Sequence, residues 1–512
     1  MTAELSAPRE VAAPRMGWKS ALAVIAFVAL ILRLYAINNN GFWYDEAYSA
    51  SIIKASFHDL LSGKVKDAGN PPLYWAALKL WASWFGSTDL ALRSFSVLCG
   101  VATVALIGLL GKRLLDTSTG LIAAALFAIS PLSIELSDEA RCYALLHLLA
   151  VASTLSFVRW LNTRDWIDLA VYSFMTFLTC YCHYYGFFVP LAHGIALLLV
   201  AEHRKKILYW LGAMAAAGAI WLTWMPSFLA QLHQPGNLAR MGDRWTLQFA
   251  ITPLAFALGR TFAWRDSEHW LLGLAMLLTL MGFITTAVYG LFRLRDWRFG
   301  LTLCAGWLLL PMIVPLLGAL AGKPLFHHRA ASVALPVFIL LIAYGIAQTP
   351  SVLRIIISVL IFGATTFSLF NYAIQPLKDD WRGAAPQIVS SSNGQIPLLF
   401  DTPIEIVSFE HYVLPAQTPP LMYGLVDGPS ADGTMMADAY KSGQRIDWTP
   451  RDCTAELLAC PRLCLILCVP SGSPAAYRKF FVDHDYNVTD SFHFHRIDVL
   501  FFAKREKSAT QP

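Results

Sequence analysis

The chain has 512 residues, of which 56% are hydrophobic and 14% charged, and its mean hydropathy is +0.51. Soluble domains carry about 25% charged residues, so this composition excludes an ordinary soluble protein and places most of the chain in lipid. The net charge of +5 is small and scattered, without a basic stripe between stacking aromatics, which excludes nucleic acid as a partner.

Eleven apolar segments are predicted to span a membrane, because a span needs roughly 17 to 25 apolar residues. They cover residues 21–37, 90–110, 120–134, 142–160, 166–182, 186–201, 207–224, 270–292, 299–320, 330–347 and 353–370, of which the third, fifth and sixth are short. Residues 1–20 form a polar tail, and no small-residue cleavage site follows it, so the first span is predicted to stay uncleaved.

Lys and Arg residues gather in alternate short loops, which sets the orientation, since cytoplasmic loops carry an excess of these residues. With the N-terminus in the cytoplasm, five loops there are basic, at residues 112–113, 159–164, 204–206, 293–298 and 354. The opposite face then receives the long connections 38–89 and 226–269 and everything after residue 372. The odd number of spans predicts that the C-terminal segment lies outside.

The first outer loop, residues 38–89, carries two adjacent carboxylates, Asp45 and Glu46, directly after the first span. Its aromatic stretch through Trp81, Trp84 and Phe85 predicts interfacial helices, because Trp favours the headgroup level. A solvated acidic loop and an ordinary aromatic belt are the simpler alternatives. Against them, ordered loops longer than about 15 residues usually have a function.

Residues 21–374 form the predicted transmembrane domain, and from residue 375 to 512 the composition becomes that of a soluble domain. Short apolar runs at 396–400, 463–469 and 497–503 predict strands, and 404–413 and 474–485 predict helices between them. A small α/β domain on the outer face is therefore expected. It has no Gly-rich phosphate loop.

Four of the nine Cys residues, Cys453, Cys460, Cys464 and Cys468, fall in this domain, where an oxidising compartment makes a disulfide plausible. Four Cys residues allow three full pairings. A zinc site is the sharper alternative, but gaps of six, three and three residues do not match a CxxC ligand pair.

The hairpin between the third and fourth spans brings further charge to the outer face. On a helix, Glu135, Asp138 and Glu139 would share one face, and Arg141 would follow three residues after Asp138. Three acids in one turn repel each other unless a positive group compensates. The alternatives are a solvated helix end with a local salt bridge, or a cation or sugar site with Arg141 on a phosphate.

Cations gather in the loop before the tenth span, where Lys323 and Arg329 flank two His residues and face a phosphate-rich boundary. Ordinary headgroup contact is the alternative there. Arg33 lies inside the first span, and an intramembrane charge is a functional candidate by default, although snorkelling could accommodate it.

Carboxylates on two hairpins and cations on a third are what a transferase with a lipid-phosphate-linked donor needs. A carboxylate removes the proton from an attacking hydroxyl, and cations or a metal ion stabilise the leaving phosphate. Asp45, partly desolvated by its aromatic neighbours, is the predicted base.

Five segments resemble the signature segments of GT-C glycosyltransferases. They are Phe42-Trp43-Tyr44-Asp45-Glu46-Ala47-Tyr48, Asn70-Pro71-Pro72-Leu73-Tyr74, Glu139-Ala140-Arg141-Cys142-Tyr143-Ala144-Leu145, His183-Tyr184-Tyr185-Gly186 and Asp380-Trp381-Arg382-Gly383. The most similar branch contains protein O-mannosyltransferases, the lipid A aminoarabinose transferase and rhizobial galacturonosyltransferases. The resemblance covers nearly the whole chain.

This resemblance implies a GT-C fold of about 11 transmembrane helices with a periplasmic α/β domain. It implies inverting transfer of a sugar from a polyprenyl-phosphate donor to a lipid, glycan or protein acceptor at a bacterial plasma membrane. Asp45 matches the essential first-loop acid, Glu46 its neighbour, and Asp138 or Glu139 the second-loop acid. The expected donor-phosphate contacts are Arg33, Arg141, Tyr143, His183, Lys323 and Arg329, and the loop motif comprises Asn70, Pro71, Pro72 and Tyr74.

Family members often have His ahead of the Pro pair, where this chain has Asn70, and this difference counts against metal coordination through this loop. A divalent metal ion stays open as a cofactor. The competing hypothesis is a lipid or glycolipid transporter or flippase, which also needs many spans and buried charge. Transporters usually show paired repeats with broken helices at the bilayer midplane. Here the charge gathers at one interface. An inactive assembly scaffold is a third possibility.

Overall fold

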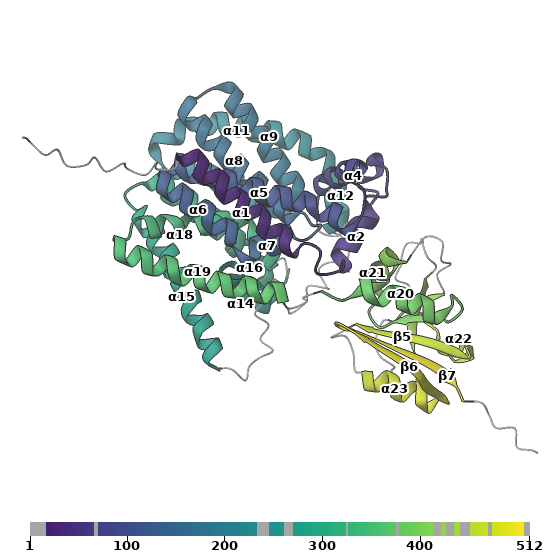
Figure 1. The fold of residues 1–512 in the computed structure, drawn as a ribbon. Coiled ribbons are helices and arrows are strands. Elements are labelled where there is room, and N and C mark those ends of the chain that lie inside the picture. Colours follow the sequence, from purple (N-terminus) through teal and green to yellow (C-terminus); the bar gives the residue numbers. More distant parts are fainter. Residues whose placement is uncertain are drawn as a thin grey trace, which may run out of the picture.

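The computed structural model describes residues 17–65, 70–232, 245–260, 270–323, 326–374, 378–413, 421–425, 435–440, 451–468 and 474–505. The first part of the chain forms a helix bundle, and a sheet with its own helices lies at one end of that bundle (Figure 1).

The helices of the bundle are α1 (Trp18–Ala36), α5 (Asp89–Leu114), α6 (Thr117–Ile129), α7 (Pro131–Ser137), α8 (Tyr143–Thr163), α9 (Trp166–Cys182), α10 (Phe188–Leu199), α11 (Ile207–Trp221), α12 (Met225–Leu232), α14 (Trp245–Leu258), α15 (Trp270–Arg293), α16 (Arg298–Leu320), α17 (His328–Ala331), α18 (Leu335–Ala347) and α19 (Ser351–Ile374). Short 3-10 turns, η1 (Tyr184–Phe187), η2 (Ala201–Lys206), η3 (Leu222–Trp224) and η6 (Ser332–Ala334), join several of them.

Eight helical segments in the described part of the chain are long and apolar enough to cross a membrane, or nine if the bent pair α6 and α7 counts as one span. Two of the predicted spans, α9 and the segment Tyr184–Leu199, are shorter apolar helices. Each of the eleven predicted spans thus coincides with a helix or a helix pair. The helix α14 was not expected, because it falls in what was predicted to be the second long outer loop.

Burial separates the helices of the bundle into inner and outer ones. The apolar window of the segment His328–Gln348 is 89% buried and that of α8 is 67% buried, whereas those of α1 and α19 are each 17% buried. In a protein that spans a membrane, α8 and α18 therefore form the centre, and α1 and α19 face lipid.

The third predicted span is broken rather than straight. The helices α6 and α7 meet at an angle of 59°, where Ser130 adopts an extended conformation and Pro131 starts the second helix. Proline suits the first helical position and stops the preceding helix from continuing. The break directs the acidic hairpin that follows α7 into the end of the bundle.

The first loop contains three short helices, α2 (Tyr44–Ile52), α3 (Phe57–Leu61) and α4 (Leu73–Phe85), as expected. Ser56 caps α3 by accepting a hydrogen bond from the backbone amide of Asp59. The exposed Trp84 and Phe85 at the end of α4 have the composition of an interfacial helix.

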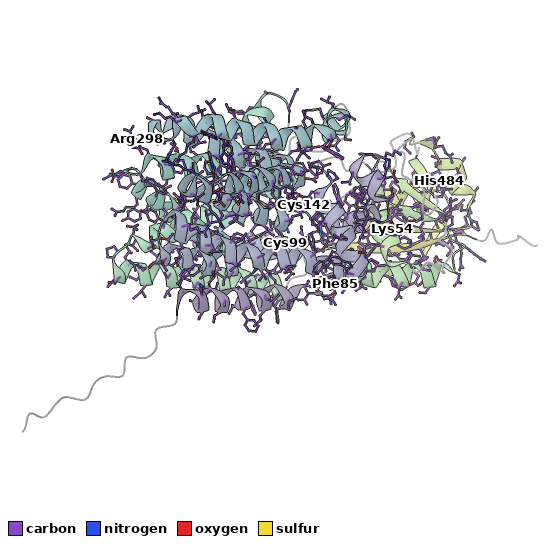
Figure 2. The ribbon with its side chains drawn as sticks, turned by 90° about the horizontal axis from the view of Figure 1, so that it is seen from above. Lys54, Phe85, Cys99, Cys142, Arg298 and His484 are labelled. Atoms are coloured by element: carbon purple, nitrogen blue, oxygen red, sulfur yellow. The ribbon has the colours of Figure 1, made fainter. Side chains whose placement is uncertain are left out.

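The basic loops and the C-terminal domain lie at opposite ends of the bundle. Figure 2 shows Arg298, which starts α16, far from the C-terminal domain, and Cys142, which precedes α8, on the side towards it. The Lys112 ammonium, near the end of α5, lies over the Trp18 ring at the start of α1, 4.2 Å from the ring centroid. The N-terminal end of α1 thus belongs to the basic end.

In the described part of the C-terminal domain, seven strands form one sheet in the order β4-β3-β2-β1-β5-β7-β6. Its elements are α20 (Trp381–Ser392), β1 (Leu398–Phe400), η7 (Pro403–Glu405), α21 (Ile406–Tyr412), β2 (Met422–Leu425), β3 (Met436–Tyr440), β4 (Arg451–Asp452), α22 (Thr454–Ala459), β5 (Arg462–Cys468), α23 (Pro474–Asp483), β6 (Tyr486–Phe494) and β7 (Ile497–Lys504). β1 pairs in parallel with β2 and β5, and the remaining pairs are antiparallel. Separate apolar clusters include residues of α20 and α21 on one side and of α22 and α23 on the other.

The disulfide that the sequence makes plausible in this domain is not formed, since no disulfide bond joins any of the nine Cys residues in the described part of the chain. Cys464 and Cys468 lie four residues apart on β5, about 13 Å at the usual rise of a strand, which exceeds the reach of a disulfide. Cys453 packs in the other apolar cluster, away from both. These thiols serve as small core residues.

Candidate active site

The helix α2 contributes two carboxylates to the site, Asp45 and Glu46, which lie on its first turn. Adjacent helical residues point about 100° apart, so the two carboxylates face different surroundings. The Glu46 side chain is fully buried and accepts two hydrogen bonds of 2.7 Å from Arg93, one of 2.8 Å from Lys378 and one of 2.9 Å from the Ala140 amide. Burial alone would raise the pKa of Glu46, but the charges of Arg93 and Lys378 lower it.

Asp45 is more accessible, with a side chain that is 24% exposed. Its Oδ2 accepts a hydrogen bond of 3.0 Å from Arg329, and the Arg141 Nε lies 3.9 Å from the same oxygen. The Arg329 guanidinium stacks over Trp43, 4.3 Å from the ring centroid. Arg329 is thus fixed between a ring and a carboxylate, with Asp45 open to solvent.

The acidic hairpin differs from the predicted helix. The helix α7 ends at Ser137, so Asp138 and Glu139 do not continue its face. Arg260, which is distant in sequence, binds two of these acids instead. Its Nε donates a hydrogen bond to Glu135 at 2.8 Å, and its Nη2 donates one to Glu139 at 2.7 Å. This guanidinium supplies positive charge to two of the three neighbouring acids, Glu135 and Glu139.

Gly259 allows Arg260 to approach this closely. Its φ is +75°, which favours glycine, and an added Cβ would lie 2.3 Å from Glu135 Oε1. The same oxygen accepts a hydrogen bond of 2.8 Å from the Arg260 amide. Backbone and side chain of Arg260 together therefore hold Glu135.

Asp138 and Glu139 differ in charge although both are buried. Burial raises the pKa of Asp138 to about 8, so this carboxyl group is protonated at neutral pH, and Tyr372 donates a hydrogen bond to it at 3.1 Å. Burial alone would also raise the pKa of Glu139, but the guanidinium groups of Arg329 and Arg260 hold it well below its usual range. Glu139 is therefore the charged acid, and it shares Arg329 with Asp45.

Arg33 lies inside the bundle rather than beside Asp45. Its side chain is fully buried, and its five N–H groups donate to Ser137 and Ser133 hydroxyls and to the Ala29, Ala128 and Phe127 carbonyls. These contacts tie α1 to α6 and α7. A contact with donor phosphate stays a prediction that this arrangement does not favour.

Most other predicted residues line the same end of the bundle. Tyr143 and His183 are buried neighbours, with ring centroids 6.0 Å apart. In the loop motif, Asn70 accepts a hydrogen bond from the Cys142 thiol, and Tyr74 in α4 bonds to Ser96 at 3.2 Å.

The remaining predicted residues lie at helix ends. Pro71 precedes α4, and Pro72 occupies the N-cap position of that helix without a side-chain hydrogen bond. Lys323 is exposed just after α16.

Sequence reasoning missed three cations of the site: Arg93, Arg260 and Lys378. Arg93 carried a usable signal, because it is a charge inside the second predicted span. Arg260 lies in a long loop and Lys378 just before the C-terminal domain, so nothing local marked either of them.

The surroundings of Asp45 do not fit a divalent metal ion. Two guanidinium groups already face its carboxylate. Among the residues that the structure describes, no three His, Cys, Asp or Glu side chains converge as metal ligands.

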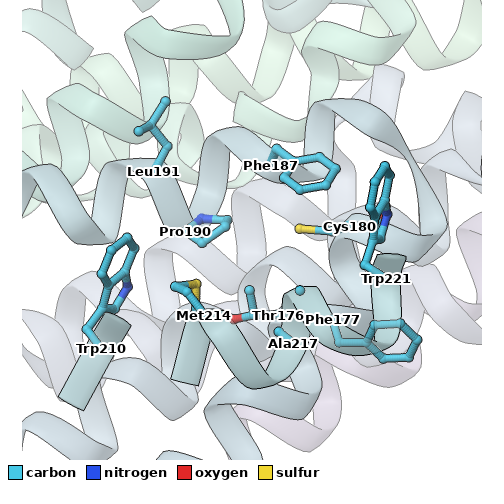
Figure 3. Close-up of a pocket in the computed structure, with 11 residues that line it drawn as sticks. Thr176, Phe177, Cys180, Phe187, Pro190, Leu191, Trp210, Met214, Ala217 and Trp221 are labelled. Atoms are coloured by element: carbon cyan, nitrogen blue, oxygen red, sulfur yellow. The ribbon is translucent and has the colours of Figure 1, made fainter. Parts of the chain in front are cut away.

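An apolar cavity of about 260 Å³ lies elsewhere, among α9, α10 and α11. Figure 3 shows Trp210 and Trp221 at its two ends, with Pro190 and Met214 between them. Its lining has no charged side chain. This cavity can accommodate apolar chains but cannot perform acid-base chemistry.

A family model described as dolichyl-phosphate-mannose-protein mannosyltransferase matches residues 69–226. This segment covers α4 and the helices from α5 to the start of α12, including the acidic hairpin. No curated protein sequence matches the chain.

Solved structures extend the likeness to nearly the whole chain. The apo structure of ArnT from Cupriavidus metallidurans aligns with a TM-score of 0.61 at 10% identity, over 95% of this chain and 98% of that one. The Archaeoglobus fulgidus oligosaccharyltransferase tethered to an acceptor peptide aligns with a TM-score of 0.51 at 12% identity, over 92% and 81%. The zinc and sulfate complex of the archaeal enzyme aligns at 12% identity, with a TM-score of 0.47, over 77% of this chain and only 61% of its own length.

The protein is therefore a multi-pass membrane protein with buried ion pairs at one end of its bundle. Its fold is the GT-C fold that the ArnT structure shows, and residues 69–226 carry the match to the mannosyltransferase model.

Proposed function

We propose that the protein is an inverting glycosyltransferase that moves a sugar from a polyprenyl-phosphate carrier to an acceptor hydroxyl. The reaction would take place at the outer face of a bacterial plasma membrane, and the acceptor would be a lipid, glycan or protein of the cell envelope. The observation that carries the proposal is Asp45, an accessible carboxylate flanked by two guanidinium groups at the head of the bundle.

Asp45 has the position of a general base. Glu46 and Glu139 are buried and not accessible to a substrate, because Glu46 accepts hydrogen bonds from four donors and Glu139 is bound by two guanidinium groups. A base must reach the proton that it removes, so accessibility favours Asp45.

The arginines have the position of a phosphate clamp. In the proposed step, Asp45 takes the proton of the acceptor hydroxyl, and the oxygen attacks the anomeric carbon. The bond between that carbon and the phosphate oxygen breaks on the opposite face, so the configuration inverts. Arg329 and Arg141 stabilise the negative charge that remains on the polyprenyl phosphate.

The charge balance of the site supports an anionic donor. Among the described residues, the ion pairs of the site join five cations to four carboxylates: Arg93, Arg141, Arg260, Arg329 and Lys378 with Asp45, Glu46, Glu135 and Glu139. One positive charge in excess favours an anion. An archaeal oligosaccharyltransferase of the same fold, with a TM-score of 0.50, has been solved in complex with a dolichol-phosphate.

The location of the charges favours transfer over transport. The ion pairs gather around the first loop and the acidic hairpin, where Lys378 from the start of the C-terminal domain joins them. A transporter would be expected to carry them near the midplane of the membrane.

The test is turnover by the purified protein in nanodiscs. Polyprenyl-phosphate sugars are offered one at a time with envelope extracts, and the released polyprenyl phosphate is measured. Mass spectrometry of envelope glycans from a deletion strain identifies the missing sugar and its acceptor. A deletion strain with unchanged glycans, together with no release from any donor, would refute the proposal.

A further inference from the structure

Lys378 connects the C-terminal domain to the active site. It lies between α19, the last helix of the bundle, and α20, the first helix of the domain. Its side chain is 10% exposed, and its ammonium donates to Glu46 Oε2 at 2.8 Å. The ammonium group of a residue at the start of the C-terminal domain therefore lies beside the carboxylates of the first loop.

The domain is also anchored to the bundle at Asp89, the first residue of α5. Arg382 donates to this carboxylate at 2.7 Å, the His411 ring nitrogen lies 2.8 Å from it, and the Tyr412 hydroxyl donates to it at 2.5 Å. Three side chains from α20 and α21 thus converge on one acid. This contact holds the domain next to the first loop.

The domain holds the start of α2 as well. The Tyr412 hydroxyl accepts a hydrogen bond of 2.5 Å from the Phe42 amide, and the His411 ring stacks on the Phe42 ring with centroids 4.8 Å apart. Phe42 lies three residues before Asp45. Together with Lys378 on Glu46, these contacts hold both sides of Asp45 along the chain.

Building on the proposed function, we propose that Lys378 is a positioning residue: by binding Glu46 it fixes the start of α2 and thereby the place of the Asp45 carboxylate. The hydrogen bond and ion pair of Lys378 go to Glu46, and none goes to Asp45 or Arg329. It acts through Glu46, which occupies the next position on the same helical turn.

Charge neutralisation alone does not account for Lys378, because Glu46 already has a cation. Arg93 binds both oxygens of Glu46, and it also donates to backbone carbonyls at Ile37, Asn40 and Gly41. The Arg93 pair stabilises the loop within the bundle. Lys378 adds the link to the C-terminal domain.

This difference makes Lys378 a separable target. Replacing Lys378 with Met keeps a side chain of similar length and leaves the Glu46 carboxylate paired with Arg93, so the protein is expected to fold. A misplacement of about 1 Å can cost about 100-fold in rate, so the loss should appear in kcat.

The experiment compares four full-length variants in nanodiscs: Lys378→Met, Lys378→Arg, Glu46→Gln and the double variant Lys378→Met with Glu46→Gln. Lys479→Met is the matched control, because Lys479 belongs to the same domain and its side chain is 76% exposed. Turnover and the donor KM are measured with the donor that wild-type protein uses, together with thermal unfolding of each variant.

We expect Lys378→Met to lower kcat about 10- to 100-fold with the donor KM within about threefold of wild type. Lys378→Arg should recover most of the turnover, because it keeps the charge. The double variant should be no slower than the slower single variant, because both changes remove the same contact.

Two results would overturn the positioning role. One is a kcat of Lys378→Met equal to that of Lys479→Met. The other is a raised donor KM at unchanged kcat, which would make Lys378 a donor contact. If wild-type protein turns over no donor, the proposed function fails. Thermal unfolding of the same variants then tests the Lys378–Glu46 interaction by itself. Strictly additive effects of the two changes on stability would show that the two residues do not interact, and would refute the positioning role.

Discussion

At the scale of single residues, Asp45 differs from its neighbours because solvent reaches its carboxylate while cations hold it. We expect Asp45→Asn to lower turnover at least about 100-fold, since an amide keeps the shape but cannot accept the proton. Thermal stability and donor binding should stay near wild type, because Arg329 retains Glu139 as a partner. Turnover and donor binding by the purified variant provide the measurement.

Two further variants serve as comparisons for Asp45→Asn. Asp59→Asn changes an acid of the same loop whose contacts are with Ser56 and Lys64, and it should leave turnover unchanged. Glu46→Gln should instead reduce stability, by about 3 to 5 kcal/mol, because it breaks a fully buried ion pair. Near-normal turnover of Asp45→Asn would remove Asp45 as the base and leave Glu139 as the next candidate.

The arginines beside Asp45 make a different prediction, which concerns binding. Ala at Arg141 or Arg329 should weaken donor use by about 2 to 5 kcal/mol, because each guanidinium is largely desolvated. Lys at either position should rescue only in part, since an ammonium cannot donate in a bidentate manner. Donor titration in nanodiscs measures this, with the exposed Arg451→Ala as control. Unchanged donor affinity in both Ala variants would exclude these residues from the phosphate site.

At the scale of elements, a buried acid links α20 to the turn before α21. Glu405 accepts hydrogen bonds from the Trp381 indole at 2.9 Å and the Ser408 hydroxyl at 2.8 Å. Burial, together with the nearby charge of Asp379, raises the pKa of Glu405 to about 7. The folded protein therefore binds a proton here that the unfolded chain loses near pH 4.5.

The sign of the resulting pH dependence follows from that difference. The contribution of Glu405 to stability is fully present below about pH 4.5 and is lost as the pH rises through 7, with a total of roughly 3 kcal/mol. Glu405→Gln keeps an acceptor for Trp381 and Ser408 but cannot ionise. We expect this variant to be more stable than wild type at pH 8, with the difference vanishing at pH 5. Thermal unfolding across this range is the measurement, and equal pH profiles would contradict the assignment.

The sequence predicted the elements best where a local property defines them. The apolar spans and the strands β5 and β7 carry continuous hydrophobic runs, and these were placed within a few residues. β6 was missed because most of its residues are exposed, so its side chains show no continuous apolar run. β2 was missed because its four residues are too few to show a pattern.

The ion pairs of the site were predicted only in part, because their partners are far apart along the chain. Arg329 lies 284 residues from Asp45, and Lys378 lies 332 residues from Glu46. The carboxylates were recognisable because they cluster in sequence. Which cation meets which acid depends on how α2, α7 and the loop at Arg260 pack together, and no local pattern encodes that packing.

At the scale of the whole molecule, the basic loops and the carboxylate site lie at opposite ends of the bundle, and this arrangement predicts the orientation in the membrane. The start of α1 lies beside Lys112, whereas Asn38, two residues after its end, accepts a hydrogen bond of 2.9 Å from Arg382 of the C-terminal domain. The two ends of the described chain are therefore on opposite sides of a membrane that encloses the bundle. Lys and Arg favour the cytoplasm, so the basic end should face inward and the C-terminal domain outward.

Reporter fusions test this orientation. Alkaline phosphatase joined after the C-terminal domain should be active, because it folds only outside the cytoplasm, and a fluorescent cytoplasmic reporter at the same position should stay dark. A fusion in the loop between α15 and α16, next to Arg298, should give the reverse pattern and serves as the matched control. If the C-terminal phosphatase is inactive while the fluorescent reporter lights up, the orientation is wrong. The carboxylate site would then face the cytoplasm, and an outward-facing polyprenyl-phosphate donor could not reach Asp45.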